Sequence, residues 1–292
     1  MTRDPSLWTR RATLAAAAAV AVAGRAGAED LPWRLPKLRN VKLQGHRIAY
    51  FEMGSGPPLV LVHGMSGSPA LEWGRVMTPL ARKFRVIAPY QIGFGPSDQP
   101  DLPYDAATFV DYLGGFLHAR VAEDAVILGE SFGGWVVSQY ALRQGTKTAW
   151  GQPLPRISRL VITDGAVQLP AGAGGGAEKP SINSPEVAKL THDFFVSQPP
   201  VDDSKVKGAV GPNIQAQQAT DDQLKTLKLP TLLIWGREDQ LIPLELGRHV
   251  AAQIPKSRLV IIDNCGHIPS VEQPRAFLGA LGGFLGVGLE NL

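Results

Sequence analysis

The chain has 292 residues, of which 44% are hydrophobic and one is a cysteine, and its formal net charge is +3. One cysteine excludes an intramolecular disulfide, so stability must come from a packed core, and this length and composition suit one α/β domain with an insertion. Because residues 1–28 carry four arginines against one aspartate, the remainder is neutral overall and offers no bulk charge for binding nucleic acid or an anionic membrane.

The chain begins with a segment that has the features of an export signal. Arg10-Arg11 precede a mostly alanine run over residues 12–23, and Ala26-Gly27-Ala28 supplies the small residues of a signal-peptidase site. We predict a twin-arginine-like export signal over residues 1–28, a mature start at Glu29 and a periplasmic or secreted protein. The apolar run is shorter than the ~20 residues that span a bilayer, so no stable membrane anchor is expected. The alternative is an amphipathic or disordered N-terminal tail.

Apolar runs typical of strands then alternate with helix-like segments. Most of the runs are continuous, as expected of strands buried on both faces. The expected strands lie at 47–53, 58–64, 84–90, 124–130, 159–165, 230–236 and 257–263, and the expected helices at 74–81, 107–118, 133–143, 243–253 and 273–284. This alternation predicts an α/β fold with a mostly parallel central sheet and helices on both faces.

Residues 165–228 interrupt the alternation. Near their start they contain "AGAGGGAEKP", and they continue through two or three helix-like segments with no expected strand. We predict a small helical cap over the carboxyl-terminal edge of the sheet, the edge at which open α/β sheets bind ligands. Residues 29–164 and 229–292 would then form the two parts of the core. The alternative is a surface excursion with no role.

The stretch "ILGESFGGW", residues 127–135, places Ser131 where an expected strand becomes a helix. A G-x-S-x-G pentad can arise by accident, so Ser131 as a nucleophile requires partners. Asp239 follows the expected strand 230–236, and His267 follows the last expected strand. Each has an ordinary alternative, since Asp239 could cap a helix and His267 could be a loop histidine.

Two other aspartates also follow strands. Asp164 lies at the entrance to the predicted cap, and Asp263 lies four residues before His267. So short a separation favours a bracing role for Asp263. We therefore expect Asp239 to orient His267, with Asp164 as the alternative acid.

Acyl transfer also requires donors for a developing negative charge. The loop "LVHGMSGS" follows an early buried strand. We predict that the backbone N–H groups of Met65 and Phe132 form an oxyanion hole, with Gly64 allowing a tight turn. His63 is expected to position this loop rather than to react.

Together, the segments "LVHG", "APYQIGFGPSDQP", "GESFGGW", "WGREDQLIP" and "NCGHIPSVEQP" resemble the α/β-hydrolase superfamily. The likeness is to the branch with meta-cleavage product hydrolases, epoxide hydrolases and haloalkane dehalogenases, and it extends from about Val41 to the carboxyl terminus. It implies the order nucleophile, acid, histidine, which Ser131, Asp239 and His267 follow. Epoxide hydrolases and dehalogenases of this branch use a carboxylate nucleophile and a polarising Tyr or Trp. Position 131 is serine, and residues 165–228 contain neither aromatic.

These features predict a serine hydrolase that cleaves a small or medium apolar carboxylic ester through an acyl-enzyme. A small-molecule substrate is the expected partner, with no metal and no organic cofactor; the oligomeric state is not predicted. Alternatives are a C–C bond hydrolase of the meta-cleavage type, a perhydrolase, a proline iminopeptidase and a catalytically silent binding module. In an iminopeptidase Glu178 and Glu186 would hold the amino terminus of the substrate, although we expect both to be solvated surface residues. Export argues against the C–C hydrolase. Cys265 is expected to be a buried packing thiol.

Overall fold

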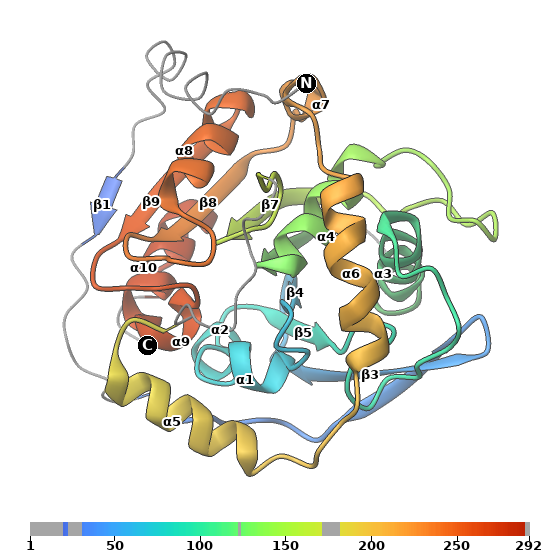
Figure 1. Cartoon of the computed structure of the whole chain (residues 1–292), viewed down its shortest axis with the longest axis horizontal. Coiled ribbons are helices and arrows are strands. Elements are labelled where there is room, and N and C mark those ends of the chain that lie inside the picture. Colours follow the sequence, from blue (N-terminus) through green and yellow to red (C-terminus); the bar gives the residue numbers. More distant parts are fainter. Residues whose placement is uncertain (1–19, 23–30, 122–123, 171–181, 290–292) are drawn as a thin grey trace.

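Nine strands form one sheet in the computed structural model, in the spatial order β1-β9-β8-β7-β6-β4-β5-β3-β2 (Figure 1). The structure describes residues 20–22, 31–121, 124–170 and 182–289. Its strands are β1 (Val20–Val22), β2 (Arg39–Leu43), β3 (His46–Met53), β4 (Pro58–Val62), β5 (Arg85–Pro89), β6 (Ala125–Glu130), β7 (Ile157–Thr163), β8 (Thr231–Gly236) and β9 (Ser257–Ile262). The strands pair in parallel except that β3 is antiparallel to both β2 and β5. The predicted mostly parallel sheet is confirmed.

Helices cover both faces of this sheet (Figure 1). They are α1 (Pro69–Trp73), α2 (Met77–Leu80), α3 (Ala106–Arg120), α4 (Phe132–Leu142), α5 (Pro185–Val196), α6 (Ser204–Ala216), α7 (Asp221–Thr226), α8 (Leu244–Gln253), α9 (Pro269–Glu272) and α10 (Pro274–Leu285). Residues of α3, α4 and α8 pack in one apolar cluster, and residues of α1, α2 and α10 pack in another. The central strands are buried from both sides, which is why they are continuous apolar runs in the sequence.

Two local expectations differ from the structure. In place of the helix expected at 74–81 the structure has the four-residue α2, and the preceding helix α1, which Ser68 caps by accepting the Leu71 N–H, ends before Gly74. Strand β2 was not expected. Its first residues are exposed, so it lacks the apolar run by which the buried strands are recognised.

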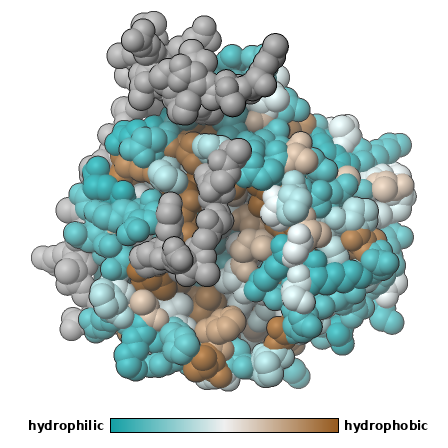
Figure 2. Space-filling model, in the orientation of Figure 1, coloured by the Kyte–Doolittle hydropathy of each residue, from teal (hydrophilic) through white to brown (hydrophobic). Residues whose placement is uncertain are grey.

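The predicted cap segment, residues 165–228, contains α5, α6 and α7 within its described part. Helix α6 packs through Val206 and Val210 on the cluster formed with α3 and α4. Helix α5 packs through Val187 against Ile268 and Val271, beside α9. The segment thus contacts the chain that follows the carboxyl ends of several strands. On the face of the molecule seen in Figure 2, hydrophobic residues are exposed toward the middle and hydrophilic residues surround them.

The predicted export signal lies largely outside the described residues. Of that segment, the structure describes β1, which pairs in parallel with Val260–Ile262 of β9. Among the described helices, none has both the length and the apolar character needed to cross a membrane. The export prediction therefore remains untested.

Candidate active site

Ser131 lies on a sharp turn between the last residue of β6 and the first residue of α4. Its backbone has φ 51° and ψ −117°, a left-handed conformation that costs a non-glycine residue about 1–3 kcal/mol. Two glycines of the pentad are required sterically. A Cβ on Gly129 would overlap the Gly133 carbonyl, and a Cβ on Gly133 would overlap the Val62 carbonyl. The pentad is therefore a strained elbow that presents a hydroxyl above the sheet.

The fold brings the three predicted triad residues into one hydrogen-bonded chain. The Oγ of Ser131 lies 2.8 Å from Nε2 of His267, and Nδ1 of His267 lies 2.7 Å from Oδ2 of Asp239. Asp239 and His267 are both buried. The other carboxylate oxygen of Asp239 accepts the N–H groups of Leu241 and Ile242, which hold the carboxylate toward the imidazole. This is the arrangement needed to pass a proton from a serine to a histidine.

The other two candidate acids differ sharply in position. Asp263 forms an ion pair with Arg237 and is partly exposed. Asp164 is fully buried, accepts the Gly236 N–H at 3.0 Å and hydrogen-bonds to the Asp239 carboxyl group. Burial raises the pKa of Asp164 well above its ordinary value, and the charge of Asp239 adds to that shift. Asp164 is thus held as an acid that donates to Asp239.

Asp164, Asp239 and His267 also form the one described cluster that could in principle hold a metal ion, with one ligand atom from each lying within 4.8 Å of the others. These groups already hydrogen-bond to one another and to the Gly236 N–H. A metal would have to replace those bonds. The existing hydrogen bonds therefore favour a hydrogen-bonded chain over a metal site at this cluster.

The loop after β4 is held so that the Met65 N–H points away from the groups that bind the Gly64 carbonyl. His63 accepts the Gln91 N–H at Nε2, so its Nδ1 carries the proton and donates to the Gly64 carbonyl at 2.8 Å. The Gly67 N–H donates to the same carbonyl. In a trans peptide the N–H is opposite the carbonyl, so the Met65 N–H points the other way. Burial lowers the pKa of His63 to about 4, which keeps it neutral and fixes this geometry.

Phe132 supplies the second predicted donor. It is the first residue of α4, where N–H groups lack intrahelical acceptors and the helix dipole favours negative charge. Within the described residues, neither the Met65 nor the Phe132 N–H has a protein acceptor. Both flank the elbow, as expected of an oxyanion hole.

Two buried glutamates were missed in the sequence. Glu130, immediately before Ser131, has an oxygen 3.6 Å from Nε2 of His267. Glu72 of α1 accepts the Gly64 N–H, with the shorter distance 2.8 Å, and hydrogen-bonds to Glu130. A charged residue ending the otherwise apolar strand β6 was the available signal for Glu130. Glu72 had none, because only the fold places α1 beside the elbow.

The cap segment approaches the site at the loop after β4. A Cβ on Gly67 would lie 2.6 Å from a carboxylate oxygen of Asp203, the residue that precedes α6. Glu186 is exposed in the first turn of α5, and Glu178 lies outside the described residues.

Cys265 is fully buried, as expected of a packing thiol, and burial raises its pKa.

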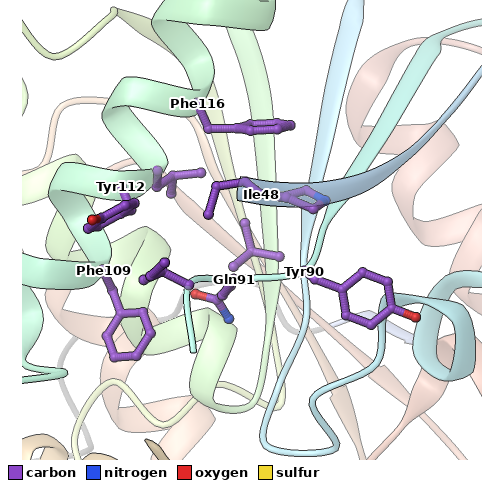
Figure 3. A pocket seen from close by; sticks show the side chains of 10 residues that line it. Ile48, Tyr90, Gln91, Phe109, Tyr112 and Phe116 are labelled. Atoms are coloured by element: carbon purple, nitrogen blue, oxygen red, sulfur yellow. The ribbon is translucent and has the colours of Figure 1, made fainter. Parts of the chain in front are cut away.

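An apolar cavity of about 20 Å³ is lined by residues of α3 and by residues 89–92 at the end of β5 (Figure 3). Phe109 and Tyr112 of α3 approach it from one side, while the ring of Tyr90 points away from them (Figure 3). This volume accommodates about one water molecule. The cavity is too small for a substrate.

Comparison with known proteins gives a consistent result. Residues 59–280 match the model of the alpha/beta hydrolase family. Among curated proteins, the chain is similar to 2-hydroxymuconate semialdehyde hydrolase of Pseudomonas sp. (strain CF600), with 30% identity over 285 residues, 88% of this chain and 96% of that protein.

Solved structures include two kinds of hydrolase. A thermophilic esterase from Thermogutta terrifontis has a TM-score of 0.69 and 25% identity, covering 86% of this chain and 98% of its own. A meta-cleavage product hydrolase from Pseudomonas fluorescens IP01 has a TM-score of 0.62, 24% identity and the same coverage. The second likeness is evidence for the fold alone.

Proposed function

Since this chain belongs to the alpha/beta hydrolase family, we propose that it cleaves neutral, apolar carboxylic esters of small or medium size through an acyl intermediate on Ser131. The observation that carries the proposal is the chain of two short hydrogen bonds from Ser131 through His267 to Asp239. That chain supplies a nucleophile, a base and an oriented carboxylate at one point above the sheet.

The mechanism follows from these contacts. His267 accepts the Ser131 proton at Nε2 as the hydroxyl attacks the ester carbonyl, and the resulting imidazolium is stabilised at Nδ1 by Asp239. The Met65 and Phe132 N–H groups bind the oxyanion. His267 then protonates the leaving alcohol. In the second half, His267 activates a water that attacks the acyl-serine and releases the acid.

The charge around the imidazole supports a neutral substrate. Asp239 and Glu130 both lie within ion-pair distance of His267, and Asp164 adjoins them. The charge of Asp239 would therefore repel an anionic substrate at His267, whereas a neutral ester experiences no such repulsion.

The second candidate is hydrolysis of a C–C bond in a meta-cleavage product, with the same serine attacking a ketone. The likeness to 2-hydroxymuconate semialdehyde hydrolase favours it. That protein's name specifies a substrate with a carboxylate. The charge of Asp239 beside His267 is the observation that ranks this candidate second.

One set of assays separates these reactions. Purified protein and its Ser131→Ala variant are assayed with p-nitrophenyl esters from acetate to octanoate and with a ring-cleavage dienoate, and Ser131 is probed with an organophosphonate. We expect ester turnover that is lost in the variant, with labelling at Ser131. A higher kcat/KM for the dienoate would establish the second candidate. Labelling elsewhere, or full ester turnover by the variant, would contradict the mechanism.

The remaining alternatives are tested with the same samples. Peracid formation from a carboxylic acid and hydrogen peroxide would indicate a perhydrolase, and release of proline from a proline p-nitroanilide would indicate an iminopeptidase. A folded protein that turns over none of these substrates and resists the phosphonate would be a binding module.

Export is also part of the proposal. Arg10-Arg11, the alanine-rich run and Ala26-Gly27-Ala28 support a twin-arginine-like signal. Cleavage before Glu29 would remove β1, which pairs only with β9 in the sheet. Strand β9 would then become the edge of an eight-stranded sheet.

A further inference from the structure

Two buried glutamates meet behind the elbow, on the far side from the Asp239 carboxylate. Glu130 ends β6 and Glu72 lies in α1, and both side chains are almost fully buried. Their carboxyl groups hydrogen-bond to each other. Two carboxylates have no proton to donate, so this contact requires one proton between them. The pair therefore carries a single negative charge.

Each member of this pair has a second contact with the site. Glu72 accepts the Gly64 N–H at 2.8 and 3.1 Å through its two oxygens, and it accepts the Ser66 hydroxyl. These bonds fix the loop that carries the Met65 N–H. Glu130 places Oε1 3.6 Å from Nε2 of His267, the nitrogen that faces Ser131. Among the described residues, that oxygen has no hydrogen-bond partner.

The protonation states are consistent with this geometry. Burial raises the pKa of Glu72 to about 7. Burial, together with the neighbouring Glu72, raises the pKa of Glu130 well above its ordinary value. One shared proton near neutral pH follows from these shifts.

We propose that Glu72 and Glu130 act as one positioning unit, in which a shared proton leaves one negative charge that stabilises protonated His267 from the Nε2 side while Glu72 holds the oxyanion loop. The inference rests on the proposed function, since it assumes that His267 accepts a proton from Ser131. Asp239 stabilises the same imidazolium from the Nδ1 side, with Asp164 behind it. Negative charge would therefore lie on both sides of the imidazolium during the reaction.

The test uses variants that differ in where the charge lies. In Glu72→Gln the charge remains on Glu130, beside His267. In Glu130→Gln it lies on Glu72, one side chain further away, and in each single variant the amide can donate the hydrogen bond that the shared proton made. The double variant has no charge at the pair. The control is Glu52→Gln. Glu52 is a partly buried carboxylate that pairs with three arginines and lies far from the elbow.

The measurements are kcat, KM and the pH profile of kcat/KM on p-nitrophenyl butyrate. We expect Glu72→Gln to retain kcat within about tenfold and the double variant to lose about 100-fold, with KM changed by less than about threefold. Glu72→Gln, which keeps the charge beside His267, should not move the acid limb to lower pH, whereas Glu130→Gln should move it down and the double variant should move it furthest, because less negative charge near the ring then favours the imidazolium. Glu52→Gln should keep the wild-type profile.

The outcomes are separable. If the wild type hydrolyses the ester but the two single variants share one acid limb, the position of the charge has no effect and the inference is wrong. Should the double variant fail to fold by circular dichroism, the two single variants decide alone. A wild type that neither turns over esters nor is labelled at Ser131 would instead refute the proposed function.

Discussion

Replacing Asp239 by asparagine should abolish most turnover, because it moves the proton of the neutral imidazole from Nδ1 to Nε2. One Asp239 oxygen accepts the Leu241 and Ile242 N–H groups at 2.8 and 3.0 Å, and the other faces Nδ1 of His267 at 2.7 Å. An asparagine must keep its carbonyl oxygen toward the two N–H donors. Its NH₂ group would then face Nδ1, and Nδ1 would have to accept.

The consequence falls on the other nitrogen of the ring. A neutral imidazole that accepts at Nδ1 carries its proton on Nε2, the atom 2.8 Å from the Ser131 hydroxyl. That nitrogen can no longer take the serine proton. The same substitution in a protease triad lowers kcat by about 10⁴ while the geometry survives, which corresponds to about 5 kcal/mol of barrier. We expect a loss of that order here, close to that of His267→Ala.

Matched controls come from the other two aspartates. In Asp164→Asn the carbonyl oxygen can keep the Gly236 N–H, and the NH₂ group can donate to Asp239 in place of the carboxyl proton. Asp263 pairs with Arg237 rather than with His267. Both variants should keep most of their turnover if they fold.

The assay is the turnover number on one activated ester for the four variants Asp239→Asn, His267→Ala, Asp164→Asn and Asp263→Asn, with circular dichroism to confirm folding. A crippled Asp164→Asn together with an active Asp239→Asn would refute the reasoning. The acid would then be Asp164.

Two further predictions concern stability and processing. Burial keeps His63 neutral with a pKa of about 4, whereas the unfolded chain protonates it below about 6.5, so its contribution is present above pH 6.5 and is lost as pH falls toward 4. The unfolding free energy of the wild type relative to His63→Gln should therefore drop by about 3 kcal/mol from pH 7 to pH 4 in urea titrations, and a constant difference would contradict the tautomer assigned to His63. Intact mass of protein from the native host's periplasm should show a chain starting at Glu29; a full leader on cytoplasmic protein would show that export is wrong.

Much of the fold could be predicted because its strands are buried on both faces. All residues of β6 and β8 are buried, so each is a largely apolar run that local sequence reveals. The edge strand β2, with exposed residues at its start, has no such signal. The boundary of α1 was missed because it depends on a cap by Ser68 rather than on an apolar period.

The candidate triad was predictable from chain order, since carboxyl ends of parallel strands meet at one edge of the sheet. Ser131, Asp239 and His267 each follow a strand, and β6, β8 and β9 are parallel members of that sheet. The choice between Asp239 and Asp164 was less secure from the sequence. Because the two residues follow neighbouring strands, the sequence places both near His267. Only the structure shows which of the two carboxyl groups faces Nδ1.

The sequence by itself determined the elbow, because the strained backbone at Ser131 needs small neighbours at Gly129 and Gly133. This requirement is local, so a pattern of five residues is enough to indicate it. Only the tertiary structure decided the electrostatics. Helix α1 and strand β6 are separated by more than fifty residues, yet their packing puts Glu72 against Glu130 and within reach of His267. Charge interactions depend on distance and burial in space, so no spacing along the chain could specify that the two carboxyl groups share a proton.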